Sequence, residues 1–287
     1  MIIVNKDILE KVYPPRPLEV KKYDYGLLLI IGGGEFYSGS PALSALSGFR
    51  AGADMVRLIA PKRAADIIAS FAPILAAFPL DNTHLLKQHL PTLLTMTESA
   101  RESAQGKVAV VIGGGMGRSQ ETQDTILEYL SNISVPVVID ADAIHAIAKR
   151  LDVLVGKPFL ITPNTFELTL LGGKDVRPLE LDQRIQEVQA VALRLRTTIL
   201  LKAKTDIITN GTDVALNETG SPYMSIGGAG DTLAGIAGAL LARGVDPFVA
   251  AQAAAYINGK AGEAAAKIYK ESLVATDLID AIKDVIG

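Results

Sequence analysis

The residues best suited to chemistry lie together in one glycine-rich stretch, Met224–Gly235. Gly227, Gly228 and Gly230 precede an apolar helical run, so backbone amides at a helix start can approach an anionic ligand closely. Asp231 follows at the start of the same helix. Its carboxylate could cap free N–H groups, or it could take a proton from a hydroxyl that attacks a bound phosphate. The stretch predicts an anion site with one candidate catalytic base.

A second polar pair has the spacing of one helical turn. Asn164 and Glu167 follow the short apolar run 159–162, and residues three apart at a helix start share one side of the helix. They could bind hydrated Mg²⁺ or phosphate. Alternatively, Asn164 caps the helix while Glu167 reaches back to it, and spacing alone favours this capping pair.

Charged residues also stand where apolar runs end. Lys202 ends the run 198–201, where it could extend along the rim to solvent or neutralise a phosphate. Asp140 and Asp142 follow the run 135–139. Asp142 is the expected helix cap, whereas Asp140 at a strand end could face a ligand or a metal.

These residues require a scaffold that brings strand ends together. Two continuous apolar runs, 26–31 and 107–112, lead into the glycine loops 32–34 and 113–117. Such runs are typical of strands buried on both faces, and in open parallel sheets ligands bind at the carboxyl ends of the strands. Neither loop matches the Gly-x-Gly-x-x-Gly pattern of a Rossmann dinucleotide site.

Strand and helix patterns alternate along the rest of the chain. Strands are expected at 55–60, 135–140, 159–162 and 198–202, and helices at about 41–53, 120–130 with Ser119 as its cap, 182–196, 231–243, 247–269 and 276–286. Asn210-Gly211 predicts a hairpin between 207–209 and 214–217. No linker interrupts the pattern, which predicts an α/β fold in a single domain over residues 1–287.

The composition excludes several classes of protein. The chain has no cysteine, which excludes disulfides, thiol catalysis and thiolate metal sites. A net charge of −3 argues against nucleic acid or an anionic membrane surface as the main partner. No apolar run approaches the roughly 20 residues that cross a bilayer, and the first residues do not read as a secretory signal. We therefore expect a cytoplasmic protein without nucleic-acid or membrane partners.

Taken in order, the motifs resemble one enzyme family. They are Gly32–Pro41, Phe49–Ala53, Gly113–Gly117, Val138–Ala143, Ile161–Glu167, Leu201-Lys202 and Gly227–Gly235. Over about residues 20–286 the chain is similar to the ADP/ATP-dependent NAD(P)H-hydrate dehydratases of the ribokinase-like fold. The resemblance implies a central, mainly parallel β-sheet flanked by helices on both faces. Many family members carry an N-terminal epimerase domain, and this chain resembles the dehydratase domain alone.

The resemblance also implies a repair function. The family returns the hydrated cofactors NADHX and NADPHX to NADH and NADPH, using a phosphoryl group of ADP or ATP to turn the ring hydroxyl into a leaving group. Asp231 resembles the active-site aspartate. Nucleotide binding is implied for Lys202, Ala203, Lys204, Thr205, Gly228, Ala229 and Gly230, and hydrate binding for Ser40, Gly115, Gly117, Asn164 and Asp231. The predicted Mg²⁺ ligands, Glu167 and Asn164, rest on their spacing.

The chain departs from the family pattern at two places. The family usually has His-Pro-Gly-Glu at Asn164–Glu167, and Lys-Gly at Lys202-Ala203, where this chain has one residue fewer before Thr205. The Asn-x-x-Glu spacing is also typical of ribokinase-like vitamin and sugar kinases, so a small-molecule kinase is the first alternative. A nucleotide-binding regulator without turnover is the second. Because the family often forms tetramers, we expect a homo-oligomer.

Overall fold

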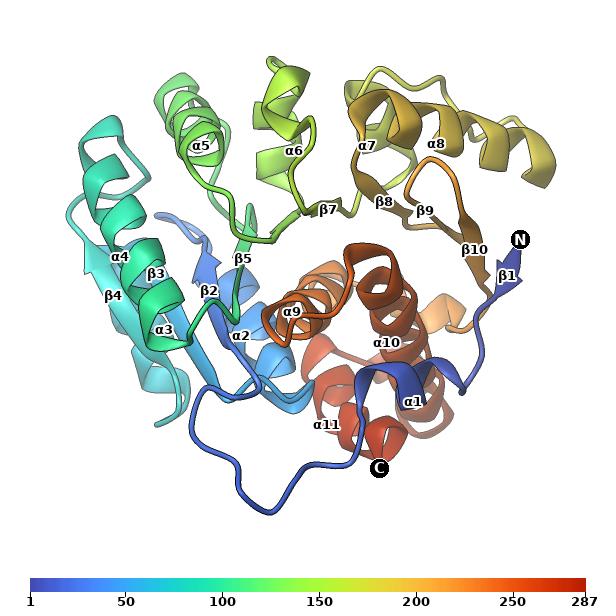
Figure 1. The fold of residues 1–287 in the computed structure, drawn as a ribbon, viewed down its shortest axis with the longest axis horizontal. Helices are drawn as coiled ribbons and strands as arrows, with labels where there is room; N and C mark the ends of the chain where they lie inside the picture. Colours follow the sequence, from blue (N-terminus) through green and yellow to red (C-terminus); the bar gives the residue numbers. More distant parts are fainter.

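A computed structural model describes all residues 1–287 and contains one large sheet with helices on both faces (Figure 1). Its strands are β1 Ile2–Ile3, β2 Leu27–Ile31, β3 Met55–Pro61, β4 Ala76–Leu80, β5 Val108–Ile112, β6 Val137–Ile139, β7 Phe159–Ile161, β8 Thr198–Leu201, β9 Asp206–Thr209 and β10 Val214–Asn217. Their order across the sheet is β1-β10-β9-β8-β7-β6-β5-β2-β3-β4. Only β9 runs antiparallel to its neighbours, so the predicted mainly parallel sheet is confirmed.

Eleven α-helices connect and follow these strands. They are α1 Ile8–Val12, α2 Gly39–Arg50, α3 Lys62–Phe71, α4 Leu90–Ser103, α5 Gln120–Asn132, α6 Asp142–Ile147, α7 Thr165–Leu170, α8 Leu181–Leu195, α9 Ala229–Ala242, α10 Pro247–Tyr269 and α11 Ala275–Ile286. The predicted cap of α5 is confirmed, because Ser119 Oγ accepts a hydrogen bond from the Thr122 amide. At α10, Asp246 caps the helix and Pro247 occupies its first position, where a missing N–H costs nothing.

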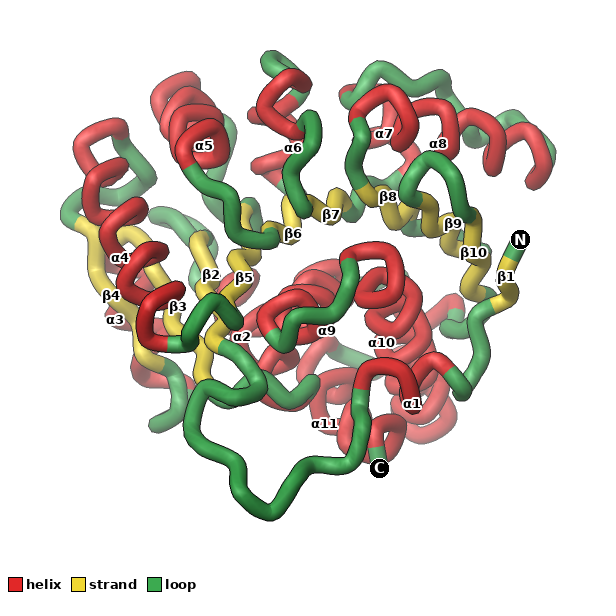
Figure 2. Tube along the Cα trace, in the orientation of Figure 1, coloured by secondary structure: helices red, strands yellow, loops and turns green.

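The sheet separates two hydrophobic cores of similar size, with 43 and 42 buried residues. Successive side chains of β2 point into opposite cores. Leu28 and Ile30 face the core that α2, α9 and α10 form with the sheet. Leu27, Leu29 and Ile31 face the core that contains α4, α5, α6 and α8. Figure 2 shows these helices as two layers with the strands between them. Burial on both faces explains why the strands read as continuous apolar runs rather than as alternating ones.

Small residues allow α2 and α9 to pack at close range. A Cβ on Gly235 would overlap the carbonyl oxygen of Ser44, so the two helix backbones touch at this point. The Ser44 hydroxyl also donates to the carbonyl oxygen of Asp231 at 2.9 Å. This packing places the N-terminal turn of α2, which carries Ser40, beside the N-terminal turn of α9, which carries Asp231.

Several elements were absent from the sequence prediction. β1 and β4 form the two edges of the sheet, and α3 and α4 lie on opposite sides of β4. The predicted hairpin is confirmed as β9 and β10, and the three C-terminal helices begin and end within a few residues of their predicted bounds. None of the helices is both long enough and apolar enough to cross a membrane.

Candidate active site

The site centres on Asp231 in the first turn of α9. Gly228 is the N-cap residue of this helix, and Asp231 is the third residue inside it. The carboxylate forms no hydrogen bond with the helix amides; instead its Oδ1 accepts a hydrogen bond from Ser40 Oγ. The capping interpretation of Asp231 is therefore wrong, because the carboxylate is directed away from the helix end and toward α2.

The surroundings of Asp231 favour a proton acceptor that titrates close to neutral pH. Burial raises the pKa of its carboxyl to about 6, although the hydrogen bond from Ser40 lowers it. The charge of Asp140 raises this pKa further, and that of Lys202 lowers it. A carboxylate with a pKa near 6 is mostly ionised at pH 7 and is still basic enough to take a proton in a transition state.

Lys202 and Asp140 form an ion pair at the ends of β8 and β6, the two strands on either side of β7. Lys202 Nζ lies 2.7 Å from Asp140 Oδ1, and the Thr162 hydroxyl donates to the same oxygen at 2.7 Å. Asp140 is only 4% exposed, while the Lys202 side chain is 24% exposed and is not extended into bulk solvent. Burial lowers the pKa of Lys202, but the charge of Asp140 and its hydrogen bond outweigh burial and raise the pKa overall. Lys202 is a fixed cation.

Asn164 and Glu167 form the capping box that their spacing favours. Asn164 Oδ1 accepts hydrogen bonds from the Phe166 and Glu167 amides, each at 2.9 Å. Glu167 Oε2 accepts one from the Asn164 amide at 2.8 Å. Both lone pairs of Asn164 Oδ1 are thus in use, so Mg²⁺ bound to this oxygen would break the cap. Burial raises the pKa of Glu167, whose Oε1 forms no hydrogen bond.

Asp142 does not cap its helix, and the prediction that it would is wrong. The N-cap position of α6 is Ala141, and Asp142 forms no hydrogen bond with the α6 amides. Its Oδ2 instead accepts from the Gly117 amide at 2.9 Å, and its Oδ1 accepts from Arg118 Nε at 2.7 Å. The side chain therefore braces the glycine loop that follows β5, a contact between segments that no local pattern reveals.

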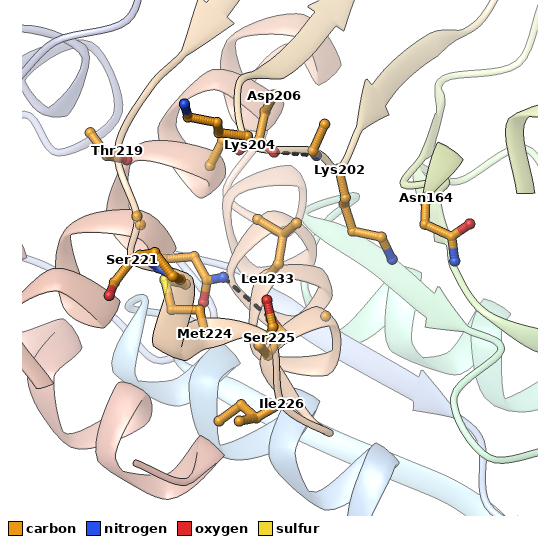
Figure 3. Close-up of a pocket in the computed structure, with 18 of the residues that line it drawn as sticks. Asn164, Lys202, Lys204, Asp206, Thr219, Ser221, Met224, Ser225, Ile226 and Leu233 are labelled. Carbon is orange, nitrogen blue, oxygen red and sulfur yellow. Dashed lines mark hydrogen bonds between the residues drawn. The ribbon is translucent and has the colours of Figure 1, made fainter. Parts of the chain in front are cut away.

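Two cavities open on either side of the α9 start. The first, here named the Lys202 cavity, has a volume of about 980 Å³. Its walls include Asn164, Lys202, Ala203, Lys204, Asp206, Ser225, Ala229 and Gly230. Figure 3 shows Lys202 and Asn164 extending into it from neighbouring segments, which are also joined by a 2.8 Å hydrogen bond from the Lys202 amide to the Pro163 carbonyl.

The second, here named the Ser40 cavity, has a volume of about 870 Å³. Its walls include Tyr37, Ser40, Gly115, Gly117, Arg118, Asp142, Gly227, Gly228 and Asp231. Asp231 lines this cavity, and Gly230, the residue before it, lines the Lys202 cavity. The first turn of α9 is thus the wall shared by the two cavities, with Lys202 on one side and the candidate base on the other.

The structure brings most of the predicted residues to one of these two walls. Of the residues predicted to bind nucleotide, Lys202, Ala203, Lys204, Ala229 and Gly230 line the Lys202 cavity, whereas Gly228 lines the Ser40 cavity and Thr205 lines neither. Of those predicted to bind the hydrate, Ser40, Gly115, Gly117 and Asp231 line the Ser40 cavity, but Asn164 lies in the Lys202 cavity.

Sequence reasoning missed a carboxylate in the wall of the Lys202 cavity. Asp206 accepts hydrogen bonds from the Ala203 amide at 3.0 Å and from Asn217 Nδ2 at 3.0 Å. Burial raises its pKa to about 6. These bonds tie the turn after Lys202 to β9 and β10, so Asp206 fixes the shape of this wall. No motif indicates it, because its partners are distant in sequence or belong to the backbone.

The comparisons of this chain with known proteins agree on one family. The sequence profile of the NAD(P)H-hydrate dehydratases matches residues 28–284. The bifunctional NAD(P)H-hydrate repair enzyme Nnr of Pyrobaculum aerophilum is 36% identical over 94% of this chain and 52% of its own length. The ADP-dependent (S)-NAD(P)H-hydrate dehydratase of Cenarchaeum symbiosum is 32% identical over 99% of this chain and 96% of its own length. The chain thus spans about half the length of the bifunctional relatives it matches.

Solved structures show the same fold. The ADP/ATP-dependent NAD(P)H-hydrate dehydratase of Bacillus subtilis, crystallised with ATP and Mg²⁺, superposes with a TM-score of 0.80 at 22% identity, over 99% of this chain and 97% of that one. Ribokinase of Thermotoga maritima superposes with a TM-score of 0.60 at 14% identity, over 90% of this chain and 99% of that one. The fold is ribokinase-like, as predicted, and the chain belongs to the NAD(P)H-hydrate dehydratase family.

Proposed function

We propose that the protein uses a nucleotide phosphoryl group to dehydrate NADHX and NADPHX back to NADH and NADPH. The observation that carries this proposal is the position of Asp231 on the wall between two cavities. One cavity presents a fixed cation, Lys202, and the amides at the start of α9, as a nucleotide phosphate requires. The other holds the candidate base with room for a second, larger substrate.

The proposed reaction has two steps. Asp231 accepts the proton of the ring hydroxyl as the hydroxyl oxygen attacks the terminal phosphorus of the nucleotide, and the bond from that phosphorus to the bridging oxygen breaks. The phosphorylated ring then loses phosphate by cleavage of its C–O bond, together with a proton from the neighbouring carbon, which restores the reduced nicotinamide. Lys202 and the amides of Ala229 and Gly230 neutralise the phosphate during transfer.

Mg²⁺ fits this site as an ion carried by the nucleotide rather than by a protein cage. The structure contains no group of three or more His, Asp or Glu residues with metal-binding geometry. Mg²⁺ commonly binds through one or two carboxylates, several waters and substrate phosphates. Among the predicted ligands, Glu167 retains a free carboxylate oxygen for a water-mediated contact, whereas the amide oxygen of Asn164 already accepts two hydrogen bonds. When bound, the ion would neutralise charge on the phosphates.

The proposal is tested by recovery of reduced nicotinamide absorbance from NADHX. We expect recovery only when ADP or ATP and Mg²⁺ are both present, because the ring hydroxyl is a poor leaving group until it is phosphorylated. The same preparation without nucleotide is the control. Recovery at full rate without nucleotide would contradict the proposal, and nucleotide-dependent phosphorylation of a vitamin or sugar with no NADH formed would favour the kinase alternative.

A pH dependence follows from the pKa of Asp231. Its carboxyl must be ionised to accept a proton, so kcat/KM for the hydrate is expected to fall about tenfold per pH unit below a limb near pH 6. Ser40→Ala should move this limb to higher pH, since the hydrogen bond from Ser40 lowers the pKa. Rates measured from pH 5 to 8 at saturating nucleotide test both points. If the rate instead falls only below pH 4.5, or if Ser40→Ala does not move the pH at which it falls, the titrating group is not Asp231.

Lys202→Met is expected to weaken nucleotide binding about 10- to 100-fold, the usual effect of losing a charge-assisted hydrogen bond. The substitution also leaves Asp140 buried without its cation, so the free energy of unfolding should fall. The double variant Lys202→Met/Asp140→Asn is the matched control, because it removes both charges. It should regain stability without regaining affinity. Calorimetric titration with ADP and thermal melting separate the two effects, and unchanged affinity in both variants would make Lys202 a structural residue.

The remaining predictions stay predictions: residues 1–287 as a single dehydratase domain, a homo-oligomer, and a cytoplasmic location. Size-exclusion chromatography with light scattering would measure the oligomeric state directly.

A further inference from the structure

We propose that Arg118, in the loop between β5 and α5, binds a phosphate group of the dinucleotide substrate in the Ser40 cavity. The inference rests on the proposed function, which places the hydrate of a dinucleotide in this cavity. Such a substrate carries a diphosphate bridge, and the NADPHX form carries a further phosphate on its ribose. A site for it must therefore neutralise several negative charges.

The charges that line the Ser40 cavity make Arg118 the one side chain suited to this task. Three carboxylates face the cavity, from Glu35, Asp142 and Asp231, and no lysine lines it. Arg118 is its single arginine, and His84 is the only other basic side chain in the lining. An anion entering a cavity lined by carboxylates is repelled unless a fixed cation offsets them. Arg118 is the one side chain of the lining that is always protonated, so it is the strongest candidate partner for a substrate phosphate.

One hydrogen bond, from Nε, orients the Arg118 side chain and leaves its terminal donors free. Its Nε donates to Asp142 Oδ1 at 2.7 Å, and Asp142 Oδ2 accepts from the Gly117 amide at 2.9 Å. The Arg118 carbonyl accepts from Gln123 Nε2 at 3.0 Å. The two terminal amino groups form no hydrogen bond within the protein, and the side chain is 56% exposed. A guanidinium fixed at Nε presents two parallel donors, the geometry that matches phosphate oxygens.

An ordinary surface ion pair with Asp142 is the competing explanation for Arg118. Exposed pairs contribute only about 0 to 1 kcal/mol to stability. On that explanation the loss of Arg118 would change little apart from the order of the loop 113–117, and its effect on any ligand of the cavity would not depend on phosphate. The two explanations therefore differ in which ligands respond to the substitution.

The experiment is calorimetric titration of the wild-type protein and of Arg118→Met with the reaction products NADPH and NADH. Methionine keeps the length of the stem and removes the charge. We expect Arg118→Met to weaken binding about 10- to 100-fold, and Arg118→Lys to lie between it and the wild type. Arg101→Met, which removes one exposed positive charge from the last turn of α4, is the matched control and should bind like the wild type.

The ligands separate the sources of phosphate. Equal weakening for NADPH and NADH assigns Arg118 to the diphosphate bridge, and weakening confined to NADPH assigns it to the ribose phosphate; both support the proposal. Reduced nicotinamide riboside, which has no phosphate, should bind the wild type and Arg118→Met alike. Unchanged dinucleotide binding, equal weakening for the riboside, or no dinucleotide binding by the wild type would each overturn it. Because binding requires no turnover, a wild type that binds NADPH but does not dehydrate NADHX would contradict only the proposed function.

Discussion

Asp231→Asn is expected to remain folded and to bind nucleotide while losing roughly 10²- to 10⁴-fold in hydrate turnover, the usual range for a positioned acid or base. Asparagine keeps the shape of the side chain and can still accept the hydrogen bond from Ser40, but it cannot take a proton from the ring hydroxyl. The NADHX recovery assay measures the loss, and ADP titration shows whether the Lys202 cavity is intact. Near-normal turnover by the folded variant would remove Asp231 from the mechanism.

The same variant carries a stability signature that an aspartate with an ordinary pKa would lack. The folded-state pKa of Asp231, about 6, lies above its ordinary value of 3.8, so ionisation destabilises the folded protein as pH rises through this interval. Asp231→Asn should therefore unfold with a higher free energy than the wild type at pH 8, by about 1 to 3 kcal/mol. The difference should shrink as the pH approaches 4. Denaturant unfolding at the two pH values tests this, and a variant less stable at pH 8 would contradict it.

Gly113→Ala is expected to cause the largest loss of stability among single substitutions near the site. Gly113 directly follows β5 and has a φ of +132°, and a Cβ there would overlap the carbonyl oxygen of Asp140 and lie 2.9 Å from Ala143 Cβ. The variant combines backbone strain with overpacking, each about 1 to 3 kcal/mol. Because relief moves the backbone at Gly113 or at Asp140, the partner of Lys202, nucleotide affinity should fall as well.

Gly244→Ala is the control for this substitution. Gly244 also has a positive φ, +87°, but a Cβ there would meet nothing within 4 Å. It therefore carries the strain without the overlap, and Gly113→Ala should exceed it by about 1 to 3 kcal/mol in chemical denaturation. Equal losses in the two variants would show that the loop after β5 can move away from Asp140 at little cost.

The sequence was sufficient to predict the central part of the fold. The runs 26–31 and 107–112 are apolar because β2 and β5 are buried on both faces. Such a run can be recognised in the sequence without knowing which strands lie beside it. Helix starts and a turn could be predicted at Ser119, Pro247 and Asn210-Gly211, because capping and turn preferences depend only on residues close in sequence. β1 was missed because it consists of two exposed residues. β4 is as long as β2 but was missed because most of its residues are exposed and it contains Pro79, so it has no continuous apolar run.

The candidate site was less accessible to sequence reasoning. The glycines and Asp231 of the α9 start form one continuous motif, and Lys202 ends a strand, so their positions could be predicted. Asp142 could not, because it binds a loop reached only through the tertiary fold. Asp206 could not, because its partners are a backbone amide and the residue opposite it in the β9–β10 hairpin, and such contacts carry no motif. Asn164 lies with Lys202 rather than with Ser40 because the strand order places β7 next to β8, and its predicted contact with the hydrate stays a prediction.

The fate of the ring oxygen tests the central claim most directly. NADHX labelled with oxygen-18 in its ring hydroxyl is incubated with the protein, ATP and Mg²⁺, and the released phosphate is analysed by mass spectrometry. Phosphoryl transfer to that hydroxyl, followed by C–O cleavage, predicts that the label appears in inorganic phosphate, with one labelled oxygen for each NADH formed. Label in water, with unlabelled phosphate, would show that the hydroxyl leaves without being phosphorylated and would contradict the account.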